Sequence, residues 1–263
     1  PRQYSQPVLG NQQSPMPREI ELLGCSGLQI SDSSDMADDA AAVVWDSALV
    51  LLHYLSKRQR EGRCLVSGRP VLELGSGTGV VGLAAAALGA SSVALTDLSH
   101  VLPNIQRNIQ ANQAAIGSAR VAALPLSWGD PAHLREVWAW FGQAEQHHQS
   151  SAPFNLLVLA SDLAYESATL PALTKVLRSC LQGQTQVAED SQGQGQACSP
   201  QQRILLAYEE REGMDELWEE ALAASKLEAH LVPEEEQHED WRTPEIKLYW
   251  VQACSPSWSS GLD

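Results

Sequence analysis

The residues whose types and spacing suit ligand chemistry lie around position 75. An apolar run of strand-forming length, residues 71–74, is followed at once by glycines at alternate positions, Gly75, Gly77 and Gly79. A helix-forming run comes next, so the segment predicts a strand, a tight turn and a helix. Glycines permit such a turn and let a ligand lie against the main chain, while the helix directs its free N–H groups at the same point.

A carboxylate stands where the next strand ends. Residues 92–96 are strand-forming and lead into Asp97, about twenty residues beyond the glycines, the usual distance for a ribose-binding acid. A carboxylate in that place is positioned to accept hydrogen bonds from both hydroxyls of a ribose. The unit is therefore predicted to bind a nucleoside.

The kind of nucleoside depends on Glu73. Residues 77–82 also fit the G-x-G-x-x-G dinucleotide pattern, which is weak by itself. Glu73 lies inside the first strand, two residues before the first glycine, and a pyrophosphate at the turn gains nothing from a nearby negative charge. Methyltransferases that resemble this chain carry an acid there, near the cationic end of S-adenosylmethionine. The resemblance favours that cofactor, with S-adenosylhomocysteine as product.

Further polar side chains follow other predicted strands. The third strand ends at Trp128, and a continuously apolar fourth strand, residues 155–160, ends at Ser161, Asp162 and Tyr165. Ligands of α/β sheets collect at the carboxyl ends of strands, so we expect Trp128 beside an adenine and Asp162 and Tyr165 at the same crevice as the glycines. The alternative for Asp162 is a helix N-cap, with Tyr165 as a packed aromatic beside it.

The elements that must position these residues alternate along the chain. A small hairpin is expected over residues 18–31, then a helix over residues 40–55 with Trp45 in its first half, either as core or as a wall of the cofactor cleft. A helix over residues 101–115 carries an amide row, Asn104, Asn108 and Asn112, for which a solvent-facing position is the default. Further helices are expected over residues 132–143, 170–181 and 214–225, and further strands over residues 121–126, 203–208, 227–232 and 246–252.

Composition limits the possible partners. The chain has 263 residues, enough for one α/β domain, a net charge of −15 and a pI near 4.8. This acidity argues against nucleic acid and suits a basic substrate, although solubility explains it equally well. The charge-free stretch 74–96 is long enough to span a membrane, but its glycines and strand-turn-helix-strand order predict a buried core instead.

The cysteines and histidines show no metal-binding or catalytic pattern. Five widely spaced cysteines lack a C-x-x-C motif, and no H-E-x-x-H or G-x-S-x-G motif occurs. We expect free thiols in a reducing compartment, no metal, no membrane anchor and a cytoplasmic location, with the nucleus as an alternative.

The domain boundaries follow composition. Residues 1–17 are polar and proline-containing and are predicted to form a flexible tail, and residues 255–263 a second tail. Residues 18–254 are predicted to form a single domain. Within it, residues 183–202 are rich in Gln, Gly and Ser and are predicted to be a disordered insertion.

Together, these segments resemble the seven-β-strand protein-lysine methyltransferases with a D-x-x-Y motif, the group of valosin-containing-protein lysine methyltransferase and its relatives. The resemblance covers roughly residues 18 to 252 in order and departs in the Gln-rich insertion and in the longer segment after Trp128. It rests on residues 43–46 (VVWD), 72–79 (LELGSGTG), 96–98 (TDL), 108–112, 127–129 (SWG), 162–165 (DLAY), 208–211 (YEER) and 241–242 (WR).

The resemblance implies a fold and a role for each site residue. The fold is α/β, with a Rossmann-like, mostly parallel seven-stranded sheet of the class I methyltransferase type and a small N-terminal hairpin. The reaction is methyl transfer from S-adenosylmethionine to the side-chain amine of a lysine in a protein substrate. The implied cofactor-binding residues are Trp45, Glu73, Gly75, Ser76, Gly77, Asp97, Trp128 and Ser161, and the implied catalytic residues are Asp162 and Tyr165.

Several alternatives remain open at this point. The first alternative is a methyltransferase whose acceptor is a small molecule or another protein side chain. The second is a nicotinamide-dependent oxidoreductase, and the third is an inactive binding module. We see no hydride-transfer residues or substrate domain for an oxidoreductase, and the intact glycine turn, Asp97 and Asp162 argue against an inactive module. We expect a monomer whose partner is a protein presenting a lysine, with neither nucleic acid nor membrane as partner.

Overall fold

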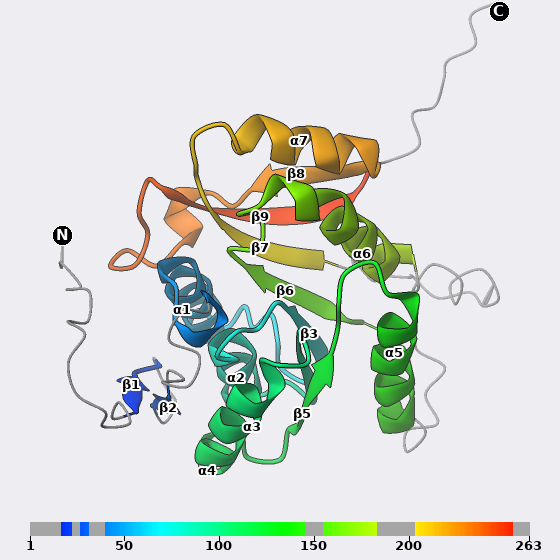
Figure 1. The fold of residues 1–263 in the computed structure, drawn as a ribbon. Helices are drawn as coiled ribbons and strands as arrows, with labels where there is room; N and C mark the ends of the chain where they lie inside the picture. Colours follow the sequence, from blue (N-terminus) through cyan, green and yellow to red (C-terminus); the bar gives the residue numbers. More distant parts are fainter. Residues whose placement is uncertain (1–16, 23–26, 32–39, 146–154, 183–202, 255–263) are drawn as a thin grey trace, which may run out of the picture.

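The computed structural model describes residues 17–22, 27–31, 40–145, 155–182 and 203–254 (Figure 1). Its centre is a seven-stranded sheet in the order β5-β4-β3-β6-β7-β9-β8, in which only β9 runs antiparallel to its neighbours. The strands are β3 (Pro70–Leu74), β4 (Ser92–Asp97), β5 (Arg120–Pro125), β6 (Leu157–Ser161), β7 (Arg203–Glu209), β8 (Leu227–Leu231) and β9 (Ile246–Ala253). This confirms the predicted fold class.

The strand order reverses direction at β3. The chain builds outward from β3 through β4 to β5, then returns to the other side of β3 with β6 and β7. In such sheets a crevice opens outside the carboxyl ends of the strands at the reversal. The glycine turn leaves β3 at that point, and the segment that carries Asp162 leaves β6 beside it.

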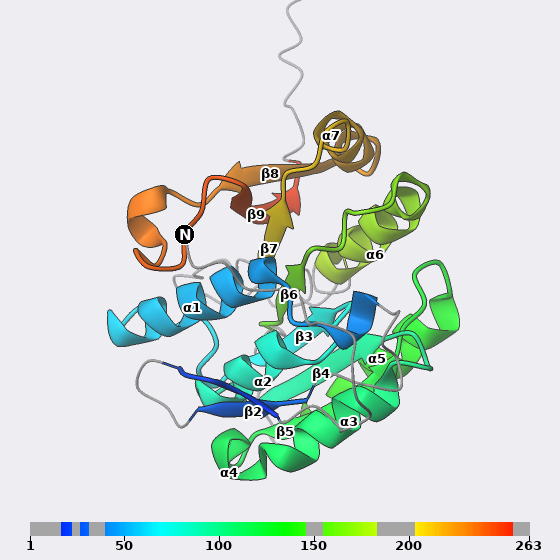
Figure 2. The ribbon, with the colours of Figure 1, turned by 60° about the vertical axis from the view of Figure 1, so that its left-hand side comes forward.

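Helices cover both faces of the sheet and bury an apolar core against each (Figures 1 and 2). On one face lie α1 (Asp46–Arg60), α2 (Val80–Ala87) and α3 (Leu102–Ala111), and on the other α5 (Pro131–Glu145), α6 (Leu170–Gln182) and α7 (Asp215–Ala224). Helix α6 illustrates why the helices pack on the sheet. Its apolar residues recur at helical spacing on one face and are buried: Leu170, Leu173, Leu177 and Cys180. Shorter pieces are α4 (Gln113–Ile116), η2 (Ala40–Ala42), η3 (Ser167–Thr169) and η5 (Glu234–Glu236).

The amide row of α3 is buried, so the default of a solvent-facing row is wrong. Strands β1 (Arg18–Ile20) and β2 (Leu28–Ile30) form the expected hairpin, and β2 lies along this helix (Figure 2). The Asn112 amide accepts a hydrogen bond from the Gln29 N–H at 2.8 Å and donates to the Gln29 carbonyl at 2.7 Å. Asn108 makes the same pair of contacts with Ser31, at 2.9 and 3.2 Å. The two amides thus bond the main chain of residues 29 and 31 as a neighbouring strand would.

The helix predicted over residues 40–55 begins later than expected. Residues 40–42 form the 3-10 turn η2, and α1 starts at Asp46. Trp45 precedes it with an extended backbone, φ −81° and ψ 153°, and its carbonyl accepts the first helical hydrogen bonds, from Ala48 and Leu49. The apolar spacing continues across this boundary because the residues before α1 are directed at a cavity, which a periodicity argument cannot distinguish from a core.

The helix predicted over residues 101–115 is interrupted at Asn112, which separates α3 from α4. The expected N-cap of α5 is present, since the Asp130 carboxylate accepts the Ala132 N–H at 2.8 Å. The predicted disordered insertion, the predicted C-terminal tail and residues 1–16 of the predicted N-terminal tail lie outside the described residues.

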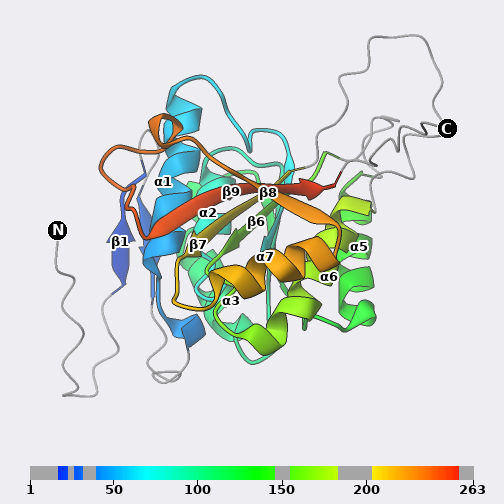
Figure 3. The ribbon, with the colours of Figure 1, turned by 90° about the horizontal axis from the view of Figure 1, so that it is seen from above.

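The charge-free stretch 74–96 is divided among β3, α2 and β4, as predicted. Among the described residues, no helix is both long and apolar enough to cross a membrane. The last two strands pair antiparallel, and β9 inserts between β7 and β8 (Figure 3).

Candidate active site

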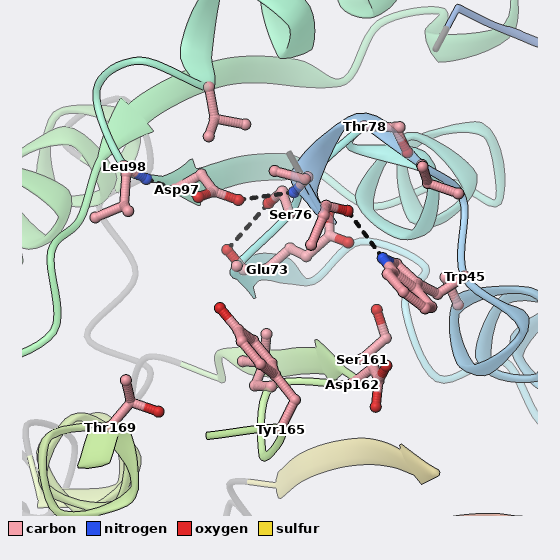
Figure 4. A pocket seen from close by; sticks show the side chains of 18 of the residues that line it. Trp45, Glu73, Ser76, Thr78, Asp97, Leu98, Ser161, Asp162, Tyr165 and Thr169 are labelled. Carbon is pink, nitrogen blue, oxygen red and sulfur yellow. Dashed lines mark hydrogen bonds between the residues drawn. The ribbon is translucent and has the colours of Figure 1, made fainter. Parts of the chain in front are cut away.

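A cavity of about 580 Å³ lies at the carboxyl ends of the parallel strands (Figure 4). Every residue that the sequence predicted for the site lines it: Trp45, Glu73, Gly75, Ser76, Gly77, Asp97, Trp128, Ser161, Asp162 and Tyr165. They come from segments far apart in the chain, which the strand order brings to one edge of the sheet. The structure thus brings the predicted residues together, while their individual roles stay predictions.

The glycine turn is fixed by its own conformation and by its neighbours. Gly75 and Gly77 have φ of 55° and 53°, a region that side chains with a Cβ rarely adopt. A Cβ at Gly75 would also collide with Leu163, and one at Gly77 would lie 3.1 Å from the Ala41 carbonyl oxygen. The turn is therefore packed between the end of β6 and the segment before α1, which makes both segments part of the cavity wall.

The Asp97 carboxylate is held by the main chain. One oxygen accepts the Gly77 N–H at 2.8 Å, and the other accepts the Leu98 N–H at 2.7 Å. Each carboxylate oxygen has further lone pairs, so this side chain remains able to accept hydrogen bonds from ligand hydroxyls. Its orientation in the cavity is set before any ligand arrives.

Glu73 is almost completely buried, with 1% of its surface exposed. Its Oε2 accepts the Gly82 N–H at 2.9 Å, so the side chain satisfies one of the free donors at the start of α2. Burial raises the pKa of Glu73 to about 8. The side chain is accordingly protonated at neutral pH without ligand, and a cation in the cavity would favour its ionised form.

Asp162 occupies an unusual backbone position at the end of β6. Its φ is 54°, its N–H donates to the Ala207 carbonyl on β7, and its Oδ2 accepts a hydrogen bond from Arg211 at 2.6 Å. Its Oδ1 is buried and has no hydrogen-bond partner among the described residues. Burial raises the pKa of Asp162, and the charge of Arg211 opposes this shift.

The alternative of an N-cap for Asp162 is wrong. The next helical segment, η3, begins at Ser167 after Glu166, several residues beyond Asp162. The conformation of Asp162 instead turns its main chain toward β7, where it contacts Ala207 and Arg211. Its carboxylate therefore pairs with Arg211 and is not engaged at a helix start.

Exposed aromatic side chains border the cavity. Trp45 is 42% exposed, and its indole N–H donates to the Ala40 carbonyl at 2.9 Å. Tyr165 is 51% exposed, and Figure 4 shows its ring across the cavity from Glu73 and Ser76. Large apolar surfaces left open at a cavity mouth are typical of ligand contact. Trp45 is thus a cavity wall, and the reading of it as core is wrong.

A family model described as lysine methyltransferase matches residues 25–224 of the chain. The chain belongs to this family. Membership confirms the enzyme class expected from the sequence, an S-adenosylmethionine-dependent protein-lysine methyltransferase, and removes the oxidoreductase alternative.

Curated relatives match this methyltransferase over part of its sequence. The mouse protein "EEF1A lysine methyltransferase 3" is 36% identical over 179 residues, which cover 63% of this chain and 67% of that protein. Mouse "Protein N-lysine methyltransferase METTL21A" is 30% identical over 203 residues, 75% of each chain. Zebrafish METTL21A is 33% identical over 147 residues, 56% of this chain and 58% of that protein.

One solved structure is a putative methyltransferase complexed with S-adenosylhomocysteine. It matches the present chain with a TM-score of 0.48 and 14% identity, and the match covers 92% of the present chain and 57% of the chain in that structure.

Sequence reasoning assigned no role to Arg211, a cavity residue of the methyltransferase that pairs with Asp162. It lines the cavity and forms ion pairs with Asp162 at 2.6 Å and with Glu209 at 3.2 Å. The signal that points to it is its place two residues after the end of β7, where side chains reach the same edge of the sheet as Asp162.

Proposed function

We propose that the cavity binds S-adenosylmethionine between the glycine turn and Asp97, and that Asp162 binds and orients the lysine amine of a protein substrate. The observation that carries the proposal is the Asp162 carboxylate. It is buried, lines the cavity, and keeps one oxygen without a partner among the described residues. A buried acceptor of this kind gains most from a charged donor that a ligand brings.

The residues present fit the cofactor. Asp97 is fixed to accept ribose hydroxyls, and Glu73 lies where a cationic group would stabilise its carboxylate. The glycines give access to the main chain, and Trp45, Trp128 and Ser161 supply the remaining wall in the roles assigned from the sequence. When bound, S-adenosylmethionine supplies an electrophilic methyl group on a sulfonium.

The chain's own contribution to transfer is alignment, desolvation and control of a proton. Methyl transfer is an in-line displacement that needs no protein nucleophile. The lysine must present a neutral amine, although its reference pKa of about 10.4 keeps it protonated at neutral pH. The positive charge of the cofactor and the partly dry cavity both favour the neutral amine, whose proton passes to solvent before transfer. We assign Asp162 to holding the amine in line, Tyr165 to shaping the entrance, and Glu209, which pairs with Arg211, to a weaker substrate contact.

The substrate is proposed to be a basic protein, because the chain carries a net charge of −15. The name of the first mouse relative refers to EEF1A, which makes that protein a suitable first acceptor to test. We also propose that the enzyme acts as a monomer in the cytoplasm, without nucleic acid. Size-exclusion chromatography with light scattering tests the monomeric state, and imaging of the tagged chain tests the location.

Calorimetric titration tests the cofactor assignment. We expect saturable binding of S-adenosylmethionine and S-adenosylhomocysteine and no binding of NAD, which serves as the control ligand. Binding of NAD alone would overturn the proposal, and binding of none of the three would identify a module without cofactor.

Replacing Asp162 tests the acceptor assignment. In Asp162→Ala and Asp162→Asn we expect transfer of labelled methyl to fall by a factor of roughly 100 or more, in line with the loss of a charged contact to the reacting group. The affinity for S-adenosylmethionine should remain within about threefold, because the cofactor is assigned to the glycine turn and Asp97. A variant that keeps most of its turnover would show that the assignment is wrong.

A further inference from the structure

Arg211 stands between two carboxylates at the wall of the cavity. Its guanidinium lies 2.6 Å from Asp162 Oδ2 and 3.2 Å from Glu209 Oε2. Its side chain is 32% exposed, whereas that of Asp162 is 6% exposed. Arg211 therefore reaches from the more open side of the cavity to a carboxylate that water hardly contacts.

The surroundings of Asp162 disfavour its ionised form, and a nearby cation offsets this effect. Burial favours the neutral acid and raises the pKa of Asp162, and Glu209 acts in the same direction. Arg211 opposes both effects by its charge and its hydrogen bond. The other titratable side chains that line the cavity are Glu73, Asp97, His100, Tyr165 and Glu166.

We propose that Arg211 is a positioning residue for methyl transfer, which fixes the Asp162 carboxylate through Oδ2 and leaves Oδ1 for the acceptor amine. The inference rests on the proposed role of Asp162 and adds the residue that makes this role possible. The Asp162 backbone already has an uncommon conformation, and its Oδ1 has no partner among the described residues. The contact of Arg211 with Oδ2, together with the main chain of Glu209, therefore determines how the carboxylate is directed.

The charges support a role toward a cation. Asp162, Arg211 and Glu209 together carry one net negative charge when all are ionised, so an incoming lysine ammonium makes the group neutral. Arginine suits the position because it stays protonated throughout the physiological range and presents several donors in a fixed plane. A lysine at this position would keep the charge and lose the planar geometry.

An NMR titration of Asp162 tests the inference without any acceptor. The full chain, saturated with S-adenosylhomocysteine, is labelled at aspartate carboxyl carbons, and Asp162→Asn identifies the resonance. We expect Asp162 to titrate about one pH unit or more higher in Arg211→Gln than in the wild type. An unchanged titration would overturn the inference.

Lys247→Gln is the matched control. It removes the same charge and breaks a neighbouring ion pair, Lys247–Glu210 at 3.7 Å, but Lys247 does not line the cavity. We expect the titration of Asp162 in this variant to match the wild type. A shift as large as that of Arg211→Gln would show that any lost charge has the effect, which contradicts a specific role of Arg211.

The pH dependence of transfer is the second readout. At low concentrations of cell-extract protein as acceptor, the rate of methyllysine formation in Arg211→Gln should fall about tenfold or more at pH 7, and its acidic limb should move to higher pH by the same amount as the NMR titration. Arg211→Lys should restore part of the limb. If Arg211→Gln does not fold, Arg211→Lys serves in both measurements, with a smaller shift in the same direction expected and no shift in either overturning the inference.

Failure of the proposed function gives a different pattern. Asp162→Asn would then transfer methyl groups as fast as the wild type, whatever the Arg211 variants do. If Asp162→Asn is inactive and Arg211→Gln keeps the wild-type rate and pH profile, only the role of Arg211 is wrong.

Discussion

Glu73 contacts the start of α2 and also lines the cavity, and the two places favour different properties of its side chain. The Gly82 N–H needs an acceptor, which the side chain provides in either protonation state, whereas the proposed cationic ligand needs a negative charge. Because burial raises the pKa of Glu73 to about 8, the side chain is neutral at pH 7 in the empty enzyme. Cofactor binding is therefore expected to be coupled to release of a proton.

Glu73→Gln tests this coupling. In the wild type near pH 7, the cationic cofactor should lower the pKa of Glu73 and release up to about one proton, so the calorimetric heat of S-adenosylmethionine binding should depend on the ionisation enthalpy of the buffer. In Glu73→Gln, which keeps an acceptor for the Gly82 N–H, this dependence should disappear. Equal heats in all buffers for the wild type would contradict the prediction.

At the residue scale, the sequence predicted which residues line the cavity, but it did not predict the ion pair that fixes Asp162. The glycines, Asp97, Asp162 and Tyr165 follow strand ends, and strand ends meet at one edge of the sheet. Arg211 was not assigned, because an ion pair between the ends of β6 and β7 depends on the backbone turn at Asp162, and its φ of 54° cannot be read from residue types.

At the scale of elements, α3 holds the N-terminal hairpin and contacts the glycine turn. Besides its two contacts with Ser31, the Asn108 side chain donates to the Thr78 carbonyl at 2.9 Å. The Asn112 side chain instead contacts Gln29 of β2 and donates to the Asn108 carbonyl of α3. The Asn108 amide thus connects Ser31, directly after β2, with the glycine turn, whereas the Asn112 amide connects β2 with α3.

Asn108→Ala and Asn112→Ala should therefore differ. Asn112→Ala leaves the partly buried main-chain groups of Gln29 without partners, and Asn108→Ala those of Ser31. Each is expected to lower the free energy of unfolding by about 2 kcal/mol in urea denaturation. Asn108→Ala should also weaken S-adenosylmethionine binding several-fold, because the Thr78 carbonyl loses its donor, whereas Asn112→Ala should leave the affinity near that of the wild type.

Gln113→Ala is the control for the two amide variants, since Gln113 is exposed and its side chain donates locally to the Ile109 carbonyl. A change in the free energy of unfolding within about 0.5 kcal/mol is expected. Equal cofactor affinities in all three variants would show that the hairpin and the turn are independent.

The errors in predicting elements have one cause. A strand or helix follows from local pattern, and most of those expected are present with ends displaced by a few residues. What a polar face contacts depends on distant chain: the Asn row faces β2, about 80 residues away, and the apolar run before α1 faces the cavity.

At the scale of the whole molecule, α1 is joined to the segment before β9 by stacked rings. His53 of α1 lies parallel to Trp241 with ring centroids 3.9 Å apart, and His238 packs edge-on at 5.6 Å. His53 is 5% exposed, and its Nδ1 has no hydrogen-bond partner among the described residues. Burial, assisted by His238, lowers the pKa of His53 to about 4.

His53→Phe should consequently make folding less sensitive to acid. Below pH 6.5 the unfolded chain binds a proton at His53 that the folded chain rejects down to about pH 4. Wild-type stability is thus full above pH 6.5 and falls toward pH 4, by a total of about 3 kcal/mol relative to the variant. Urea denaturation of both proteins at pH 7 and pH 5 measures the difference, and parallel changes in the two would contradict it.

The place of β9 in the sheet also has a consequence for biosynthesis. This strand follows β8 in the chain but lies between β7 and β8. Until β9 has been synthesised and has paired with β7, the main-chain groups on one edge of β7 have no strand beside them, and β8 cannot join the sheet at all. The nascent enzyme thus holds every strand of its cavity wall before its sheet can close, and during that interval it presents an open edge to other chains.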